Sequence, residues 1–154
     1  MDAKPRVLVM MATFNGSPYV EEQVTSILAQ DGVDVTLRVC DDQSTDETYA
    51  ILEDLAAGDA RMTVTRNATN KGVSLNFMQM VYERHAEHFD YYAFADQDDV
   101  WHPTKVEKSY LAMKEQEALH PDKPIIVHSD VRVVDSQLNV LHPSYREYGH
   151  IYPE

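Results

Sequence analysis

The chain has 154 residues, of which 26 are acidic and 13 basic, so its formal net charge is −13 at pH 7. The 44% content of hydrophobic residues is typical of a folded protein, and the length predicts one domain over residues 1–154. The negative charge argues against nucleic acid as a partner. No apolar stretch reaches the roughly 18 residues of a transmembrane segment, so we expect a cytoplasmic protein.

Strands and helices alternate in the first part of the chain. An apolar run predicts a strand over residues 6–12, and a serine followed by proline is expected to open a helix over residues 17–32, which ends at a glycine. The strand at 34–40 alternates apolar and polar side chains, which predicts one less buried face. A capping box, S-T-D-E, is expected to open a second helix over residues 44–58, before a strand at 62–65.

The same alternation continues through the middle of the chain. A helix is expected over residues 74–85, with an inward face of Phe77, Met78 and Val81. A strand follows at 91–95. His102 and Pro103 are expected to start a helix that runs to about Leu119.

The last part of the chain is expected to contain a strand, a small hairpin and a tail. Residues 125–127 predict a fifth strand, and 131–134 with 140–141 predict a hairpin. The tail after His142 has no clear period and no partner that we can identify from the sequence. Together the elements predict an α/β fold, with a mostly parallel sheet flanked by helices.

Three polar clusters follow predicted strands. They are Thr13-Phe14-Asn15, Asp41-Asp42 and Asp96-Gln97-Asp98-Asp99. Because ligands of open α/β sheets bind beyond the carboxyl ends of the strands, we expect the clusters to share one ligand-binding edge.

The first two clusters each allow two interpretations. Thr13-Phe14-Asn15 is either an ordinary turn or a group that stacks on a base and hydrogen-bonds a sugar. Asp41-Asp42 either supports the next helix or accepts an N–H from a pyrimidine base.

The third cluster favours a divalent cation. Asp96, Asp98 and Asp99 repel one another, and carboxylates at the end of a buried strand suit Mg²⁺ or Mn²⁺ held together with substrate phosphates. Trp101, just after the cluster, either packs in the core or touches a ligand.

Three further residues are candidates for ligand contacts. Lys71, before the third helix, lies either in a solvated turn or near a phosphate. His128 and Asp130 follow the predicted fifth strand and could meet a sugar. No glycine-rich phosphate-binding motif is present, which argues against dinucleotide and P-loop sites.

Four motifs together resemble the family 2 glycosyltransferases, inverting nucleotide-sugar enzymes of the GT-A fold. They are ATFNG, VCDDQSTDET, RNATNKGVSLNF and FADQDDVWHPTKVE, and with the spacing between them the resemblance covers residues 6 to about 142. The stretch HSDVRVVDSQLNVLHPSY is most similar to rhamnosyltransferases and related enzymes of polysaccharide biosynthesis.

The resemblance implies a role for each cluster. It places Thr13, Phe14 and Asn15 in the base and ribose pocket, Asp42 on the pyrimidine with Asp41 behind it, and Lys71 near the nucleotide. Asp96 and Asp98 stand where the family has its DxD motif, with Asp98 as the direct ligand of Mg²⁺ or Mn²⁺. Asp99 would face the sugar or support its neighbours.

The implied reaction moves a sugar from a UDP- or dTDP-sugar, such as dTDP-rhamnose, to a saccharide or lipid-linked acceptor, with inversion. The full-length protein would then act in cell-surface polysaccharide synthesis, in peripheral contact with a membrane. The family's general base lies well downstream of the DxD motif. The nearest candidates here are Asp130, Asp135 and Glu147, and none fits convincingly, so the catalytic residue stays unknown.

These departures leave an alternative open. We expect a GT-A domain whose acceptor half is absent, and the chain could then be a truncated, non-catalytic module that binds nucleotide and metal. Phospho-acceptor receiver domains place an acidic pair after the first strand and the acceptor after the third, whereas here the acidic residues follow the second and fourth. Haloacid-dehalogenase-like phosphatases need DxDx[TV] after the first strand, where this chain has ATFNG.

Overall fold

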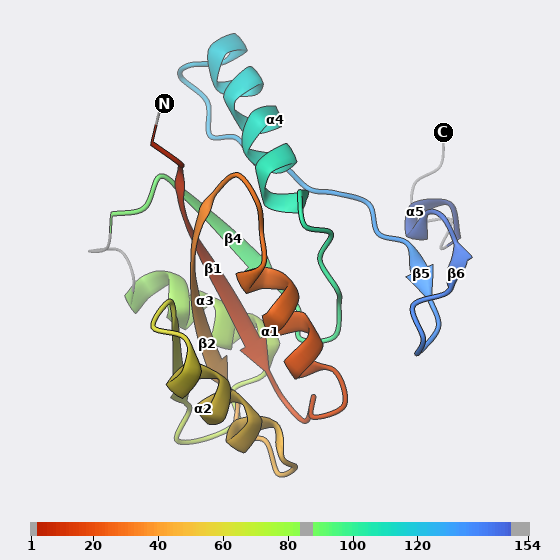
Figure 1. Ribbon diagram of the computed structural model, residues 1–154. Coiled ribbons are helices and arrows are strands. Elements are labelled where there is room, and N and C mark those ends of the chain that lie inside the picture. The colour runs from red at the N-terminus through yellow and green to blue at the C-terminus, as the bar shows by residue number, and fades with distance from the viewer. Residues whose placement is uncertain (1–2, 84–87, 149–154) are drawn as a thin grey trace. The chain divides into compact units, whose positions relative to one another are not determined.

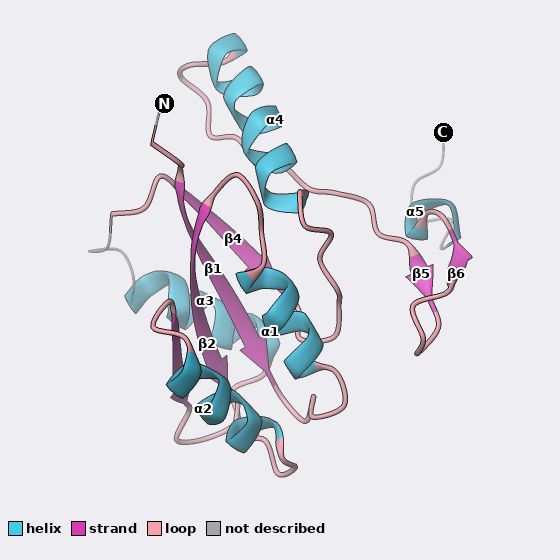
Figure 2. Ribbon diagram, in the orientation of Figure 1, coloured by secondary structure: helices cyan, strands magenta, loops and turns pink. Residues whose placement is uncertain are grey.

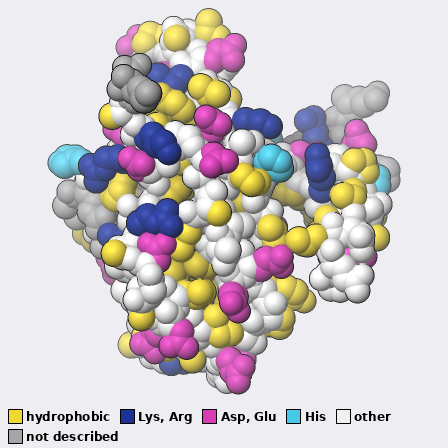
Figure 3. All heavy atoms as spheres, viewed as in Figure 1, with side chains coloured by type: hydrophobic (Ala, Val, Ile, Leu, Met, Phe, Trp, Pro, Cys, Tyr) yellow, Lys and Arg dark blue, Asp and Glu magenta, His cyan; other side chains and the backbone are white. Residues whose placement is uncertain are grey.

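A computed structural model describes residues 3–83 and 88–148. The chain forms two compact units, residues 1–110 and 111–154. Among the described residues, no helix is long and apolar enough to cross a membrane. On the face shown in Figure 3, acidic side chains are scattered rather than gathered in one patch. The expectation of a single domain over 1–154 stays a prediction.

The first unit is a parallel sheet with helices on both faces, which confirms the predicted α/β class (Figure 1). Its strands lie in the order β3-β2-β1-β4, and every neighbouring pair is parallel. In chain order its elements are β1 (Arg6–Thr13), α1 (Val20–Leu28), β2 (Asp34–Asp41), α2 (Thr48–Gly58), β3 (Met62–Arg66), α3 (Val73–Glu83), β4 (Tyr91–Ala95) and the start of α4 (Lys105–Leu119).

The alternation of side chains along β1 divides the core into two layers. Val7, Val9 and Met11 belong to the larger cluster, together with the buried residues of α1 and α2. Leu8 and Met10 belong to the smaller cluster, which includes residues of α3. Since both faces of β1 are covered, the near-continuous apolar run is that of a central parallel strand, as the sequence predicts.

The first two helices begin later than their sequence signals suggest. α1 begins at Val20, after a turn in which the Gly16 carbonyl accepts the N–H groups of Tyr19 and Val20 and the Ser17 N–H donates to Asp46. The first helix also ends at Leu28, before the predicted glycine. Side-chain hydrogen bonds to distant residues replace the expected local caps.

The predicted capping box is wrong for a related reason. α2 begins at Thr48, and its N-cap residue Glu47 makes no side-chain capping bond. Ser44 instead donates its hydroxyl to Asp41 and accepts the N–H of Asn15, so it connects two strand ends.

The inward face of α3 differs from the predicted one. Asn76 and Met80 are buried and Phe77 packs against the smaller cluster, whereas Met78 and Val81 are exposed. The helix is rotated because the Asn76 amide is buried and donates to the Cys40 carbonyl on β2. Of the predicted span, residues 84–85 lie outside the described residues.

The second unit contains the predicted hairpin and one unexpected helix. β5 (Val133–Val134) pairs with β6 (Val140–His142) in antiparallel fashion, and α5 (Tyr145–Tyr148) follows. The described part of the tail, residues 143–148, therefore does have a partner, since the Tyr145 N–H donates to the Val131 carbonyl. Residues 149–154 of the tail lie outside the described residues.

The predicted strand at 125–127 is wrong. Figure 2 shows a loop between α4 and β5, and Ile126 is 89% exposed. An apolar run becomes a strand only where a neighbour accepts its backbone hydrogen bonds, and no described strand pairs with this segment.

Candidate functional site

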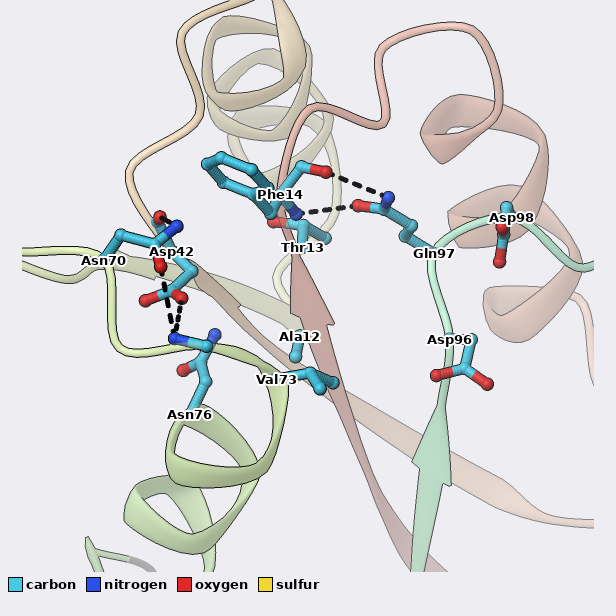
Figure 4. Close-up of a pocket in the computed structure, with 11 residues that line it drawn as sticks. Ala12, Thr13, Phe14, Asp42, Asn70, Val73, Asn76, Asp96, Gln97 and Asp98 are labelled. Atoms are coloured by element: carbon cyan, nitrogen blue, oxygen red, sulfur yellow. Dashed lines mark hydrogen bonds between the residues drawn. The ribbon is translucent and has the colours of Figure 1, made fainter.

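The three polar clusters lie at one edge of the sheet, around a cavity of about 490 Å³. Figure 4 shows Asp42 on one side, Asp96 and Asp98 on the other, and Thr13 between them. β1 is flanked by β2 and β4, so the loops after these three parallel strands are neighbours. The predicted common edge is therefore confirmed.

The loop after β1 offers a ring and a buried hydroxyl. Phe14 lines the cavity and is 46% exposed, whereas Thr13 is buried and donates its hydroxyl to Asp41. Asn15 has a positive φ of 51°, and its side-chain oxygen accepts the N–H of Thr45 at 2.8 Å. Asn15 thus joins two loops, and Phe14 is the side chain available to a ligand.

Asp41, at the end of β2, is fully buried and paired. Its carboxylate accepts hydrogen bonds from the Thr13 hydroxyl and from both the N–H and the hydroxyl of Ser44, and its Oδ2 lies 3.3 Å from Arg66 Nε. The pairing offsets the cost of burying the charge. Asp41 therefore connects the end of β2 to Thr13 at the end of β1 and to Ser44.

Asp42 is also buried, and both of its carboxylate oxygens accept hydrogen bonds. Its oxygens accept the Asn67 amide at 2.7 Å, the Lys71 N–H at 2.9 and 3.0 Å, and the Gly72 N–H at 2.7 Å. Burial raises the pKa of Asp42, but these donors outweigh burial, and the pKa lies below its ordinary value. The carboxylate therefore ties the start of α3 to the end of β2, and it lines the cavity from that position.

The carboxylates after β4 are arranged in the opposite way. Among the described residues, no hydrogen bond or ion pair reaches the carboxylate oxygens of Asp96, Asp98 or Asp99. Partial burial, and then the charges of Asp96 and Asp98, raise the pKa of Asp99, while Lys105 opposes this shift. This cluster carries uncompensated negative charge beside the cavity.

The backbone that carries these carboxylates is held by three polar residues of α1 and the turn after it. Gln23 donates to the Asp96 carbonyl at 2.8 Å, and the Ser26 hydroxyl accepts the Trp101 N–H at 2.9 Å. Gln30 donates to the His102 carbonyl. The loop is thus fixed through its main chain, which leaves the acidic side chains free.

The remaining predicted residues lie elsewhere. Lys71 does not line the cavity, and its ammonium group donates to Gln79 on α3. Trp101 is 5% exposed and packs in the larger core cluster, with Lys105 Nζ 4.1 Å from its ring. His128 and Asp130 belong to the second unit, where His128 is exposed and Asp130 accepts the Ser144 hydroxyl.

The candidate general bases also lie in the second unit. Asp135 accepts three hydrogen bonds within the β5–β6 turn, and Glu147 is an exposed residue of α5. Neither observation assigns a catalytic role, and the general base stays unknown.

Sequence reasoning missed the amide side chains that build the site. Gln97, Asn70 and Asn76 all line the cavity. Gln23, Ser26 and Gln30 are spaced three and four residues apart, which puts them on one side of a helix and could have indicated a second, polar stripe beside the apolar one. For Gln97 the only signal was its place inside the acidic cluster.

Comparison with known proteins gives a consistent result. The model of the family described as Glycosyl transferase family 2 matches residues 8–148. A similar curated protein is the dTDP-rhamnosyl transferase RfbG of Shigella flexneri, 36% identical over 101 residues, which are 64% of this chain and 35% of that protein. The chain spans between 35% and 44% of the length of the curated relatives it matches.

Two solved structures share the fold. The mannosyltransferase PcManGT from Pyrobaculum calidifontis, in complex with GDP-Man and Mn²⁺, matches 64% of this chain and 29% of its own, with a TM-score of 0.57 and 23% identity. Staphylococcus aureus TarS 1-349, in complex with UDP-GlcNAc, matches 96% of this chain and 48% of its own, with a TM-score of 0.56 and 20% identity.

Proposed function

Because this chain belongs to glycosyl transferase family 2 and has the GT-A fold, we propose that its cavity binds the nucleoside diphosphate of a nucleotide-sugar donor. The sugar would pass to an acceptor hydroxyl with inversion at the anomeric carbon. One observation carries the proposal: the carboxylates of Asp96 and Asp98, which no described residue pairs with, share a cavity with the Phe14 ring. The side with Asp96 and Asp98 suits a diphosphate with its divalent cation, and the side with Phe14 suits the nucleobase.

The residues of the third cluster fit a divalent cation. No group of three or more Asp, Glu, His or Cys side chains in the described residues could hold a metal alone. Two free carboxylates match Mg²⁺ or Mn²⁺, which proteins hold through one or two carboxylates together with substrate phosphates. Asp98 would be the direct ligand, and Asp96 would contact ribose and metal. When bound, the ion would neutralise charge on the departing diphosphate.

The nucleoside would be held by the loops after β1 and β2. The exposed ring of Phe14 offers a stacking surface, beside the buried Thr13. Recognition of a pyrimidine by Asp42 stays a proposal, and a base N–H would have to share a carboxylate oxygen with the Lys71 or Gly72 N–H. Lys71 would act mainly through this N–H, because its ammonium group is paired with Gln79.

The donor we propose is a UDP- or dTDP-sugar, with dTDP-rhamnose as the first to test. The name of the Shigella relative supports dTDP-rhamnose, and the TarS complex supports UDP-sugars. The acceptor would be a saccharide or a lipid-linked saccharide in cell-surface polysaccharide synthesis. A cytoplasmic location and peripheral membrane association of a full-length protein belong to the same proposal.

A second candidate function follows because no described residue is assigned as the general base. The carboxylates that line the cavity belong to Asp42, Asp96 and Asp98. We assign Asp42 to stabilising the fold or binding the pyrimidine, and Asp96 and Asp98 to binding the metal, so none of the three is left to act as general base. The 154 residues would then act as a nucleotide- and metal-binding module, without rapid transfer.

Binding calorimetry tests the site. We expect UDP or dTDP to bind residues 1–154 more tightly with Mn²⁺ than without it, and GDP to bind less well. Asp98→Ala should weaken the Mn²⁺-dependent binding by at least about tenfold, roughly 1.4 kcal/mol. Asp54→Ala, which removes an exposed carboxylate on α2, should leave it unchanged. Lack of binding by all three nucleotides would refute the proposed site.

A transfer assay separates the enzyme from the module. We expect residues 1–154 with dTDP-rhamnose, Mn²⁺ and a saccharide acceptor to yield little or no product, although they bind nucleotide. Steady product formation that Asp98→Ala abolishes would instead show that the general base lies within these residues.

A further inference from the structure

The side chain of Gln97 connects the two sides of the cavity. The Phe14 N–H donates to Gln97 Oε1 at 2.8 Å, and Gln97 Nε2 donates to the Phe14 carbonyl at 3.1 Å (Figure 4). Both polar groups of the amide are therefore paired with the backbone of a single residue. The last backbone pair between β1 and β4 is Met11 with Ala95, so Gln97 continues the pairing after the strands end.

The position of Gln97 links this contact to the acidic residues. Gln97 lies between Asp96 and Asp98, whose carboxylates have no partner in the part of the chain that the structure describes. The loop is anchored at Asp96 by Gln23 from α1, and at Gln97 by the loop after β1. If Gln97 moves, both neighbouring carboxylates are free to move relative to Phe14.

Gly16 leaves the space that the Gln97 amide occupies. A Cβ atom at this position would lie 2.5 Å from both Cδ and Oε1 of Gln97. No positive φ requires a glycine here, so alanine would be tolerated by the backbone and would displace the amide. Gly16 and Gln97 are 81 residues apart in the sequence and share no local motif, yet substitutions at the two positions should have the same effect.

We propose that Gln97 is a positioning residue that couples the nucleoside side of the cavity to its metal-binding side, so that base, diphosphate and metal are bound as one unit. This inference rests on the proposed function. It assigns Gln97 no contact with the reacting atoms.

The contact itself is tested without ligand, by amide hydrogen exchange at Phe14 in the full chain. Gln97→Met keeps the length of the side chain but removes both hydrogen bonds. We expect exchange at Phe14 to become about tenfold faster in Gln97→Met and in Gly16→Ala, since a hydrogen bond contributes a factor of this order. Gln116→Met, on α4, is the matched control and should leave exchange unchanged. Unchanged exchange in both test variants would overturn the proposal.

The coupling is tested by the ratio of UDP affinities measured with and without Mn²⁺. We expect Gln97→Met and Gly16→Ala each to reduce this ratio by about tenfold, and the double variant to reduce it no further, because both act through one contact. A purely structural role for Gln97 would lower stability and leave the ratio intact.

Different results would refute the proposed function and the coupling through Gln97. Wild-type protein that binds no nucleotide would refute the proposed function and, with it, the coupling. Wild-type protein that binds UDP with Mn²⁺, while Gln97→Met keeps the full ratio, would refute the coupling alone.

Discussion

Two acidic clusters occupy the same edge of the sheet and have opposite surroundings. Asp41 and Asp42, at the end of β2, are buried, and together they accept hydrogen bonds from five residues. Asp41 also pairs with Arg66. The carboxylates of Asp96 and Asp98, after β4, are exposed and have no partner among the described residues. One cluster is used to build the site, and the other is available to a ligand.

The difference teaches that position at a ligand-binding edge does not by itself make a carboxylate a ligand group. A buried charge is tolerated only when donors satisfy it, and those donors then stabilise the fold. A cluster that repels itself in the free protein costs stability, which a bound cation restores. Substitutions in the two clusters should therefore differ in size and even in sign.

The largest difference is expected between Asp41→Ala and Asp98→Ala. Asp41→Ala removes the acceptor of the Ser44 N–H and of the Ser44 and Thr13 hydroxyls, together with the ion pair to Arg66, and should lower the free energy of unfolding by about 3 kcal/mol. Asp98→Ala should change it by less than about 0.5 kcal/mol. Urea unfolding followed by Trp101 fluorescence measures both, since this single tryptophan is buried in the first unit. Equal losses would remove the distinction between the clusters.

A smaller effect, dependent on pH, is expected for Asp42→Asn. The amide cannot accept all the donors of the carboxylate, so the free energy of unfolding at pH 7 should fall by about 2 kcal/mol. Because the pKa of Asp42 is lowered in the folded state, its contribution is complete above the ordinary pKa and is lost as the pH falls below about 4. Unfolding at pH 3 to 7 should show the gap between wild type and variant narrowing in acid. A gap that stays constant would contradict the assigned hydrogen bonds.

The smallest effect has the opposite sign. Asp99→Asn removes one charge from the crowded cluster, and because the site is open to solvent we expect a gain of only about 0.5 kcal/mol at pH 7. Asp54→Asn, at an exposed position on α2, is the control and should give no gain. Destabilisation by Asp99→Asn would mean that this carboxylate also has a structural role.

Much of the fold could be predicted because its signals are local. The apolar run of β1 predicts a central strand, and the alternation along β2 predicts a strand with one less buried face, and both strands are observed. Parallel strands place their carboxyl ends at one edge, so the meeting of the three polar clusters followed from topology. The strand predicted at residues 125–127 was wrong, because an apolar run does not reveal whether a neighbouring strand is present to pair with it.

The details of the site could not be predicted because their partners are distant in sequence. Asp42 receives donors that lie 25 to 30 residues downstream, and Gln97 pairs with a residue 83 positions upstream. The face of α3 was also misjudged, because a buried amide, Asn76, outweighs the apolar Met78 at the helix surface.

The sequence by itself determined the α/β class, the family, and the meeting of three polar clusters at one edge of the sheet, because periodicity and motif order are properties of neighbouring residues. Only the tertiary structure decided which carboxylates accept hydrogen bonds within the fold and which have no partner among the described residues. It also showed that Gln97 joins the two sides of the cavity. Hydrogen bonds between loops depend on strand order and on the angle at which each loop leaves the sheet. No local pattern encodes either of these.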